Sequence, residues 1–448
     1  MRRPAFVILL AALAFGVPQS AAAEKHAAQT PVEHLVVLMQ ENHTFDNYFG
    51  LYPGADGIPA GVCMPVDPTK GEKPCVTPFH IGTRDVEPTD PDHSQSTFER
   101  QYRGGRLDGF VHALNLRNQD GRIAMGYYDE RDLQFYWNLA RQYVLYDRFF
   151  SSAQGGSTVN HVFWVAGKAP PTGDRVSRTG LEVETIFDRL QQAGVSWKFY
   201  VQNYDPTLTY RTISAAPPNR ASQVTWVPLL GIDRFLDDPR LNGHIVDLGE
   251  YYKDLENGTL PAVAYIAPSG PSEHPPSSIQ SGQTFVRTLV NSLMQSTSWS
   301  SSAFLVAYDD WGGWYDHVKP PQVDKWGYGF RVPAFVVSPY ARHGVVDHTV
   351  LDFTSILRFV EDNWRIRPLA QRDANANSIA SAFDFTAPPR DAVMIPARSP
   401  AASKDATSSP RTGPIYVTYA VGLACLVALL GWAAIDRTRR RRAGAAGR

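Results

Sequence analysis

Two pairs of polar residues, each directly after a short apolar run, are the residues of this chain best suited to chemistry. Asp309 and Asp310 follow one run, and Glu41 and Asn42 follow another. Neighbouring carboxylates repel each other unless a cation or a proton neutralises them. Oxygen ligands of this kind suit Mg²⁺, Ca²⁺ or Mn²⁺, and added histidines would also admit Zn²⁺ or Fe. We expect the two pairs to hold a divalent metal ion, although each pair alone could be a solvated loop or a helix cap.

A hydroxyl that such a metal could activate lies in the segment GGSTVNH, residues 155–161. Ser157 follows two glycines on a tight turn and could be a nucleophile whose pKa the metal lowers. The alternative is that Ser157 or Thr158 caps a helix by accepting hydrogen bonds from free backbone N–H groups, and the segment alone favours this alternative. The G-x-S-x-G elbow is absent, so a Ser-His-Asp triad has little support.

Two further histidines lie in polar loops. His93 is in PTDPDHSQ, and His274 is in the proline-bounded PSEHPP. Both could act on a substrate, although a single loop histidine is more often incidental.

Strands that alternate with helices must position these residues. The continuous apolar runs are typical of parallel strands that are buried on both faces, and they lie at residues 35–39, 262–267, 304–308 and 332–337. Apolar residues at helical spacing predict helices within 133–146, 183–190, 285–293 and 353–360. This alternation predicts one α/β domain with a doubly wound, mostly parallel sheet and helices on both faces. The carboxyl ends of such strands open into one crevice, where both acidic pairs would meet. Residues 202–245 show no period and are expected to be an insertion or a lid.

Both ends of the chain carry targeting signals. Residues 1–23 combine two arginines, an apolar stretch and small residues, which predicts a signal peptide, with an uncleaved anchor as the alternative. Residues 415–435 carry no charge and are long enough to cross a bilayer, and the arginine-rich tail 436–448 places that end in the cytoplasm. The predicted domain therefore covers residues 24–385, followed by a linker at 386–414, in a type I single-pass membrane protein with the domain outside.

Charge and cysteine content exclude some classes. The net charge is −1, and arginines gathered near the two ends leave an acidic central region that suits nucleic acid poorly. Cys425 falls in the predicted membrane helix, whereas Cys63 and Cys75 lie in a loop outside the cell, where a disulfide is expected.

Six motifs together resemble the bacterial phosphoesterase family of the alkaline-phosphatase-like superfamily, which contains phospholipases C and acid phosphatases. They run in family order over about residues 31–366: ENHTFDNYFG (41–50), GGRLDGF (104–110), GGSTVNH, SEHPP (272–276), YDDWGGWYDHVKPP (308–321) and RVPAFVVSPYAR (331–342). The resemblance implies a metal-dependent phosphoester hydrolase that forms a phosphoenzyme.

The resemblance also implies roles for individual residues. The metal ligands would be Glu41, Asn42, Ser157, Asp309 and Asp310, with Ser157 also the nucleophile. His93 and His274 would bind phosphate oxygens or protonate the leaving group, and Asn160 and His161 would bind substrate.

The substrate is the point on which this chain departs from the phospholipase members. They tend to have G-P-T and P-N-R where this chain has Gly156–Ser157 and 159–161, and Glu where it has Asp310. Ala267–Pro268 stands where the family has Asp-Pro. We therefore expect an acid-phosphatase-type phosphomonoesterase, with a phospholipase C acting on phospholipid as the alternative. A binding protein with a degenerate site is less favoured, and the sequence does not indicate the oligomeric state or the metal.

Overall fold

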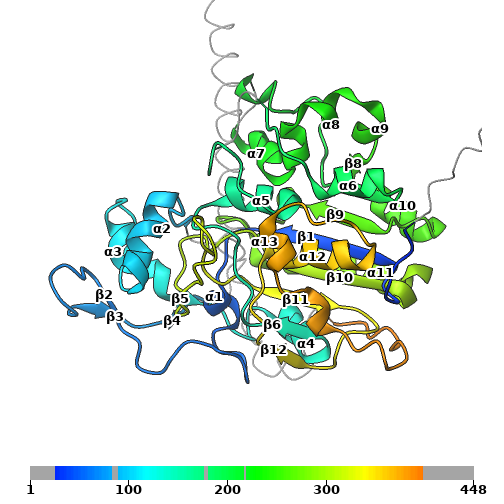
Figure 1. Ribbon diagram of the computed structural model, residues 1–448. Coiled ribbons are helices and arrows are strands. Elements are labelled where there is room, and N and C mark those ends of the chain that lie inside the picture. The colour runs from blue at the N-terminus through cyan, green and yellow to red at the C-terminus, as the bar shows by residue number, and fades with distance from the viewer. Residues whose placement is uncertain (1–25, 83–88, 176–179, 216–217, 397–448) are drawn as a thin grey trace, which may run out of the picture. The chain divides into compact units, whose positions relative to one another are not determined.

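The apolar runs before the two polar pairs form adjacent strands in the middle of a mixed sheet. The computed structural model describes residues 26–82, 89–175, 180–215 and 218–396. In this part of the chain eight strands form the main sheet, in the spatial order β12-β6-β11-β10-β1-β9-β7-β8 (Figure 1). Their bounds are β1 His34–Gln40, β6 Val144–Tyr146, β7 Trp197–Val201, β8 Ile245–Asp247, β9 Val263–Ala267, β10 Ser302–Tyr308, β11 Ala334–Val337 and β12 Val345–Asp347. The sequence prediction of an α/β fold is confirmed.

Most neighbouring strands run parallel. β8, β7, β9, β1 and β10 form one parallel block, and β12 is parallel to β6. β11 is antiparallel to both β10 and β6. The predicted mostly parallel sheet is thus confirmed, with one reversed strand that the apolar run at 332–337 could not reveal.

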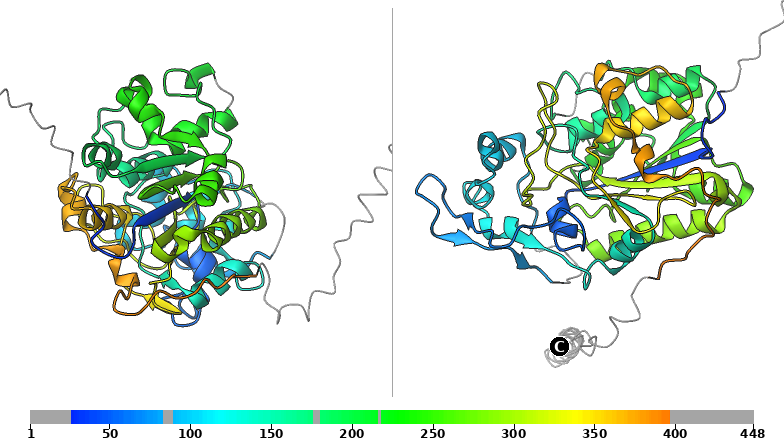
Figure 2. Two further views of the ribbon diagram at one scale, coloured as in Figure 1. Left: turned by 90° about the vertical axis from the view of Figure 1, so that its right-hand side faces the viewer. Right: turned by 60° about the horizontal axis from the view of Figure 1, so that its bottom comes forward.

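Helices cover both faces of the sheet. On one side α12 (Phe353–Asn363) packs on α5 (Ser157–Ala166), which also contacts α6 (Ile186–Gln192). On the other side α11 (Ile279–Gln295) contacts α4 (Gln134–Gln142) and α10 (Gly249–Asn257). Figure 2 shows these two groups on opposite sides of the sheet. The remaining helices are α1 Phe45–Phe49, α2 Gln95–Tyr102, α3 Phe110–Asn115, α7 Pro218–Trp226, α8 Asp233–Asp237, α9 Pro239–Asn242 and α13 Gln371–Asn375.

One predicted helix is shorter than its apolar pattern suggests. Helical spacing extends through residues 133–146, but α4 ends at Gln142 and residues 144–146 form β6. All three residues of β6 are buried, because the strand pairs with β11 on one side and β12 on the other. Burial between two strands therefore outweighs the helical pattern at this point.

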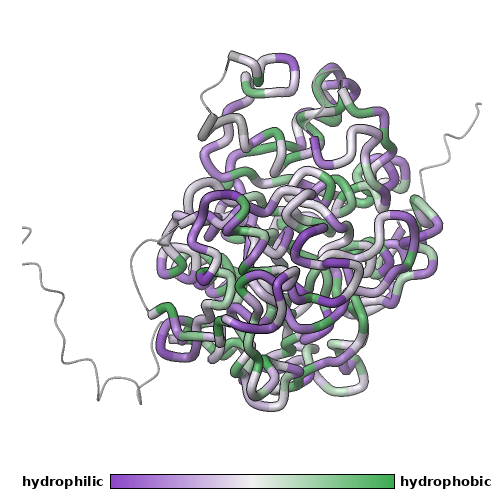
Figure 3. Tube along the Cα trace, turned by 90° about the vertical axis from the view of Figure 1, so that its left-hand side faces the viewer, coloured by the Kyte–Doolittle hydropathy of each residue, from purple (hydrophilic) through white to green (hydrophobic). Residues whose placement is uncertain are grey.

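The apolar core follows the central strands. Every residue of β10 is buried, and hydrophobic segments alternate with hydrophilic ones along the chain (Figure 3). A smaller peripheral sheet pairs β2 (Met64–Pro65) with β3 (Cys75–Val76), and another pairs β4 (Phe79–His80) with β5 (Gly126–Tyr127). The Cys63–Cys75 disulfide closes the loop that contains β2 and β3, with the two Cα atoms 5.4 Å apart. The sequence predicts this disulfide.

The predicted signal peptide (1–23), the membrane helix (415–435) and the basic tail lie outside the described residues. Among the described residues, no helix has both the length and the apolar character that a bilayer crossing requires.

The buried carboxyl pair Glu361–Asp373 predicts that the stability of this fold depends on pH. Burial and the neighbouring Asp373 raise the pKa of Glu361 from 4.5 to about 9. Between pH 4.5 and about 9, Glu361 is protonated in the folded state and ionised in the unfolded state. The free energy of unfolding therefore falls as the pH rises through this range. We expect Glu361→Gln to raise the free energy of unfolding by about 1–3 kcal/mol at pH 8, and by much less near pH 5. Urea unfolding at both pH values measures this difference.

A matched control is available on α10. Glu256→Gln changes an exposed carboxylate and should leave stability equal to that of the parent at both pH values. A Glu361→Gln effect of the same size at pH 5 and pH 8 would show that the raised pKa of Glu361 does not cause it.

Candidate metal-dependent hydrolytic site

The register of two parallel strands brings the polar pairs together. β1 and β10 pair residue for residue from His34↔Ser302 to Gln40↔Tyr308, so Glu41 and Asp309 leave the sheet side by side. The backbone N–H of Asn42 donates to Asp309 Oδ1 at 2.9 Å, which joins the two strand ends directly. This is the arrangement that the sequence predicts for the carboxyl edge of the sheet.

The Gly-Gly turn after Asp310 allows a close approach of three backbone segments. Gly312 has φ +59°, and a Cβ atom there would stand 2.2 Å from the carbonyl oxygen of Asn42. Gly313 has φ +82°, and its Cβ would stand 2.7 Å from Pro91. Side chains at these positions would be strained and would clash, so both glycines are needed to bring the strand ends and the Pro91 loop together.

Three carboxylates form a buried cluster at the edge of the sheet. Glu41, Asp309 and Asp310 are each fully buried. Burial, followed by repulsion from Asp309 and Asp310, raises the pKa of Glu41 well above its usual value. Burial and Asp309 likewise raise the pKa of Asp310. A cluster of this kind is costly to ionise unless a cation neutralises it.

His161 completes a set of potential metal ligands with these acids. Its Nε2 atom lies 3.1 Å from Glu41 Oε1 and 3.6 Å from Asp309 Oδ2. Burial lowers the pKa of His161 to about 4, so its ring is neutral at physiological pH and free to bind a metal. The sequence prediction placed His161 among substrate-binding residues, but its side chain faces the carboxylates and does not line the pocket described below.

Several atoms at this centre are buried and lack a hydrogen-bond partner in the described part of the chain. They are Glu41 Oε2, Asn42 Oδ1 and Asp309 Oδ2. Buried polar atoms nearly always have a partner, so three unpartnered oxygens on the two neighbouring strand ends indicate a missing ligand. Carboxylate and amide oxygens with one imidazole fit a divalent cation. Glu41, Asn42, His161 and Asp309 are the residues that would hold it, with Asp310 beside them.

Ser157 lies directly beside this centre. It is the first residue of α5, and its Oγ donates to Asp310 Oδ2 at 3.2 Å. The cap residue is Gly156, and it makes no side-chain capping hydrogen bond. The interpretation of Ser157 or Thr158 as a helix cap, which the sequence favoured, is therefore wrong, because the hydroxyl of Ser157 faces a carboxylate instead of the backbone.

Asp174 provides the missing cap from a distant loop. Its Oδ2 accepts from Gly156 N at 2.8 Å, and its Oδ1 accepts from Val159 N at 3.2 Å. A carboxylate is stabilising at this end of a helix, where free N–H groups and the helix dipole favour negative charge. Burial raises the pKa of Asp174. The sequence does not predict this role of Asp174, since nothing in the local PPTGDR segment distinguishes it.

Asn160 holds the turn that presents the serine. Its Nδ2 donates to the carbonyl oxygens of Gly155 and Gly156, both at 3.0 Å, and its Oδ1 accepts from Ala153 N at 2.9 Å. The side chain is buried and does not line the pocket. Its amide is thus committed to the backbone, which differs from the substrate-binding role that the resemblance implied.

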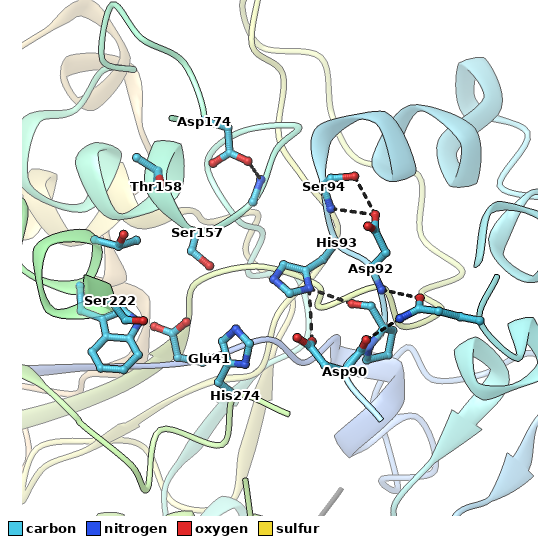
Figure 4. A pocket seen from close by; sticks show the side chains of 15 residues that line it. Glu41, Asp90, Asp92, His93, Ser94, Ser157, Thr158, Asp174, Ser222 and His274 are labelled. Atoms are coloured by element: carbon cyan, nitrogen blue, oxygen red, sulfur yellow. Dashed lines mark hydrogen bonds and ion pairs between the residues drawn. The ribbon is translucent and has the colours of Figure 1, made fainter. Parts of the chain in front are cut away.

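A pocket of about 540 Å³ opens above Ser157 and Glu41 (Figure 4). His93 and His274 also line it, with ring centroids 5.5 Å apart, and His274 lies beside Glu41. Asn42 Nδ2 lies 3.1 Å from His93 Nε2, so the histidine is linked to the carboxylate cluster. Although burial lowers the pKa of His93, the charges of Asp310 and Asp90 outweigh it and raise the pKa to about 8. All the predicted catalytic residues therefore lie around one pocket.

The pocket wall is acidic and includes residues that the sequence analysis did not identify. α7 contributes Trp226, so part of the predicted insertion or lid at 202–245 forms a wall of the site. The full lining is Glu41, Asp90, Pro91, Asp92, His93, Ser94, Gln119, Gly156, Ser157, Thr158, Asp174, Ser222, Thr225, Trp226 and His274. None of these described lining residues is lysine or arginine.

A protein-family model covers the residues of this site. The model of the phosphoesterase family matches residues 32–367, which include both strand ends, the serine turn and both pocket histidines. The chain belongs to the phosphoesterase family. The family prediction made from the six motifs is thereby confirmed, and so, at the level of the family, is the class of hydrolases that act on phosphoric ester bonds.

Curated relatives of this phosphoesterase are phospholipases C. The non-hemolytic phospholipase C of Pseudomonas aeruginosa is 28% identical over 428 residues, which cover 81% of this chain and 59% of that protein. Phospholipase C B of Mycobacterium tuberculosis is 28% identical over 80% of this chain and 79% of that protein. The non-specific phospholipase C6 of Arabidopsis thaliana is 28% identical over 72% of this chain and 64% of that protein.

Solved structures with some similarity to this phosphoesterase are more distant. The lipoteichoic acid synthase LtaP of Listeria monocytogenes aligns with a TM-score of 0.41 at 9% identity, over 80% of this chain and 79% of that one. An alkaline phosphatase superfamily protein of Vibrio parahaemolyticus aligns with a TM-score of 0.35 at 12% identity, over 77% and 73%.

Proposed function

We propose that this phosphoesterase is a metal-dependent phosphodiesterase of the phospholipase C type, with Ser157 as its nucleophile. The observation that carries the hydrolytic part is the 3.2 Å contact between Ser157 Oγ and Asp310, beside carboxylate oxygens that lack partners. A bound divalent cation would supply positive charge that favours the alkoxide of Ser157 and stabilises negative charge on the phosphoryl oxygens.

The residues of the chain would act in a simple order. Ser157 Oγ passes its proton to Asp310 and attacks phosphorus, the bond from phosphorus to the leaving alcohol oxygen breaks, and a serine phosphodiester that keeps the second alcohol group forms. His93 and His274 line the same pocket as Ser157, where they can bind phosphoryl oxygens and protonate the leaving oxygen. Water then cleaves the bond between Ser157 Oγ and phosphorus and regenerates the serine.

The charge of the pocket supports a diester over a monoester. Asp90, Asp92 and Asp174 line the wall in addition to the metal-site carboxylate Glu41, and no lysine or arginine stands among the described lining residues. A phosphomonoester dianion would meet more repulsion here than a singly charged diester. The names of the curated relatives point the same way. We therefore favour the phospholipase C alternative over the phosphomonoesterase that the sequence first suggested.

Two chromogenic substrates separate these possibilities. The full chain is assayed on p-nitrophenyl phosphorylcholine, p-nitrophenyl phosphate and phosphatidylcholine vesicles, with Mg²⁺, Mn²⁺, Ca²⁺ or Zn²⁺ and with chelator. We expect the diesters to be hydrolysed at least about tenfold faster than the monoester, and chelator to stop both reactions.

Faster turnover of p-nitrophenyl phosphate would establish the phosphomonoesterase instead. No turnover of any substrate with any of the four metals would leave the chain as a binding protein with a degenerate site.

We further propose that the catalytic domain lies outside the cell on a type I membrane anchor. The support is the predicted signal peptide at 1–23, the uncharged stretch at 415–435 and the basic tail after it. Protease added to intact cells should remove the domain and leave the tail protected. Protection of the domain would overturn this topology.

A further inference from the structure

A buried glutamate that has no role in the proposed reaction lies directly beside His274. Glu273 is in the loop between β9 and α11, has no exposed surface and adopts φ +68°. Side chains other than glycine seldom adopt this left-handed conformation, which persists where the surrounding structure enforces it. Contacts of this residue with its surroundings must therefore hold it in this conformation.

Neutral donors saturate the Glu273 carboxylate. Tyr48 and Tyr308 donate their hydroxyls to Oε2 at 2.6 and 2.7 Å, and Tyr136 donates its hydroxyl to Oε1. The amide of Gln40 adds a longer contact to Oε1 at 3.4 Å. Burial raises the pKa of Glu273 to about 7, and the tyrosine hydrogen bonds hold it from rising further. A fully satisfied buried network of this kind fixes the geometry around it.

The donors come from the elements that carry the metal site. Gln40 and Tyr308 are register partners at the ends of β1 and β10, and each directly precedes a predicted metal ligand. The backbone of the loop adds a third link, because Glu41 N donates to the carbonyl oxygen of Ser272 at 2.9 Å. The Glu273 carboxylate thus joins both strand ends to the loop that carries His274.

We infer that Glu273 is a positioning residue, which fixes His274 opposite Ser157 by tying its loop to the ends of β1 and β10. The catalytic role of His274 rests on the proposed function. The effect of Glu273 on the position of His274 does not. Outer residues that orient a reactive group typically change activity by about 10–100-fold when they are removed.

The helix after the loop offers a second way to perturb this carboxylate. Gly282 of α11 packs on Glu273, and a Cβ atom there would stand 2.1 Å from its Cγ. Gly282→Ala would therefore displace the Glu273 side chain while leaving its charge in place. Alanine also favours the helix, so this variant separates loss of position from loss of helix stability.

The test measures the position of His274 independently of activity. Carbethoxylation of His274 by diethyl pyrocarbonate is followed by peptide mass mapping in the full chain, with the exposed His348 as internal reference. We expect Glu273→Ala to speed the reaction at His274 at least about threefold and to lower kcat by about 10–100-fold with a smaller change in KM. Gly282→Ala should act in the same direction, and Glu273→Gln should restore part of kcat because it keeps one acceptor oxygen.

Glu361→Gln is the control, since it alters another buried glutamate far along the chain and should change neither readout. A Glu273→Ala protein that melts earlier but keeps parental His274 reactivity and kcat would overturn the inference. If the parent hydrolyses no phosphoester, the proposed function fails, and the carbethoxylation rates of Glu273→Ala and Gly282→Ala still decide the positioning role.

Discussion

Replacing Ser157 with alanine is expected to lower kcat for diester hydrolysis by about 10³-fold or more. The reason is that Ser157 Oγ is the hydroxyl that contacts the carboxylate cluster and opens into the pocket. Its side chain makes no helix-capping bond, so the variant should fold like the parent. Steady-state kinetics on p-nitrophenyl phosphorylcholine, together with thermal unfolding, measures both quantities.

A matched control for this change lies in another helix. Ser281→Ala alters an exposed hydroxyl in the first turn of α11, outside the pocket, and should keep parental activity. Acid quenching of the parent during turnover of this diester should trap a phosphorylcholine group on Ser157. Full activity of Ser157→Ala would contradict the serine mechanism and would indicate that water attacks phosphorus directly.

Replacing Glu41 with glutamine is expected to have opposite effects on the metal-bound and the metal-free protein. Glu41 contributes an orphan oxygen to the predicted metal site, so its loss should weaken metal binding by at least about 100-fold and abolish turnover. In chelator the same change removes one of three buried, mutually repelling carboxylates. We therefore expect the metal-free variant to be roughly 1–3 kcal/mol more stable than the metal-free parent.

Metal analysis and urea unfolding, each with and without chelator, test both parts. Glu256→Gln is the control, because it removes an exposed carboxylate and should change neither metal content nor stability. A Glu41→Gln protein that is less stable than the parent in chelator would mean that Glu41 holds the fold by its own hydrogen bonds.

The contrast between Asp309 and Asp174 shows why sequence reasoning located part of the site and missed the rest. Asp309 follows a continuous apolar run, and such a run predicts a buried strand whose end lies at the crevice of the sheet. Asp174 reaches the same pocket from an irregular loop and caps a helix that begins earlier in the chain. Contacts between separate loops leave no periodic signal, so no pattern in the sequence could find it.

Asn160 and His161 show a second limit of prediction from the sequence. The motif places Asn160 and His161 near the site but does not tell which way each side chain points. Adjacent residues on α5 point in different directions, so Asn160 turns to the backbone of its own loop while His161 reaches Glu41.

The sequence by itself determined the family, the α/β class and the residues at the ends of β1 and β10. Strand periodicity and short motifs are local properties, so they can be read without knowing the fold. The tertiary structure decided the reversed direction of β11, the end of α4, the carboxylate–imidazole grouping and the acidic wall of the pocket. These features depend on which distant segments meet, because burial and electrostatic repulsion act through space rather than along the chain.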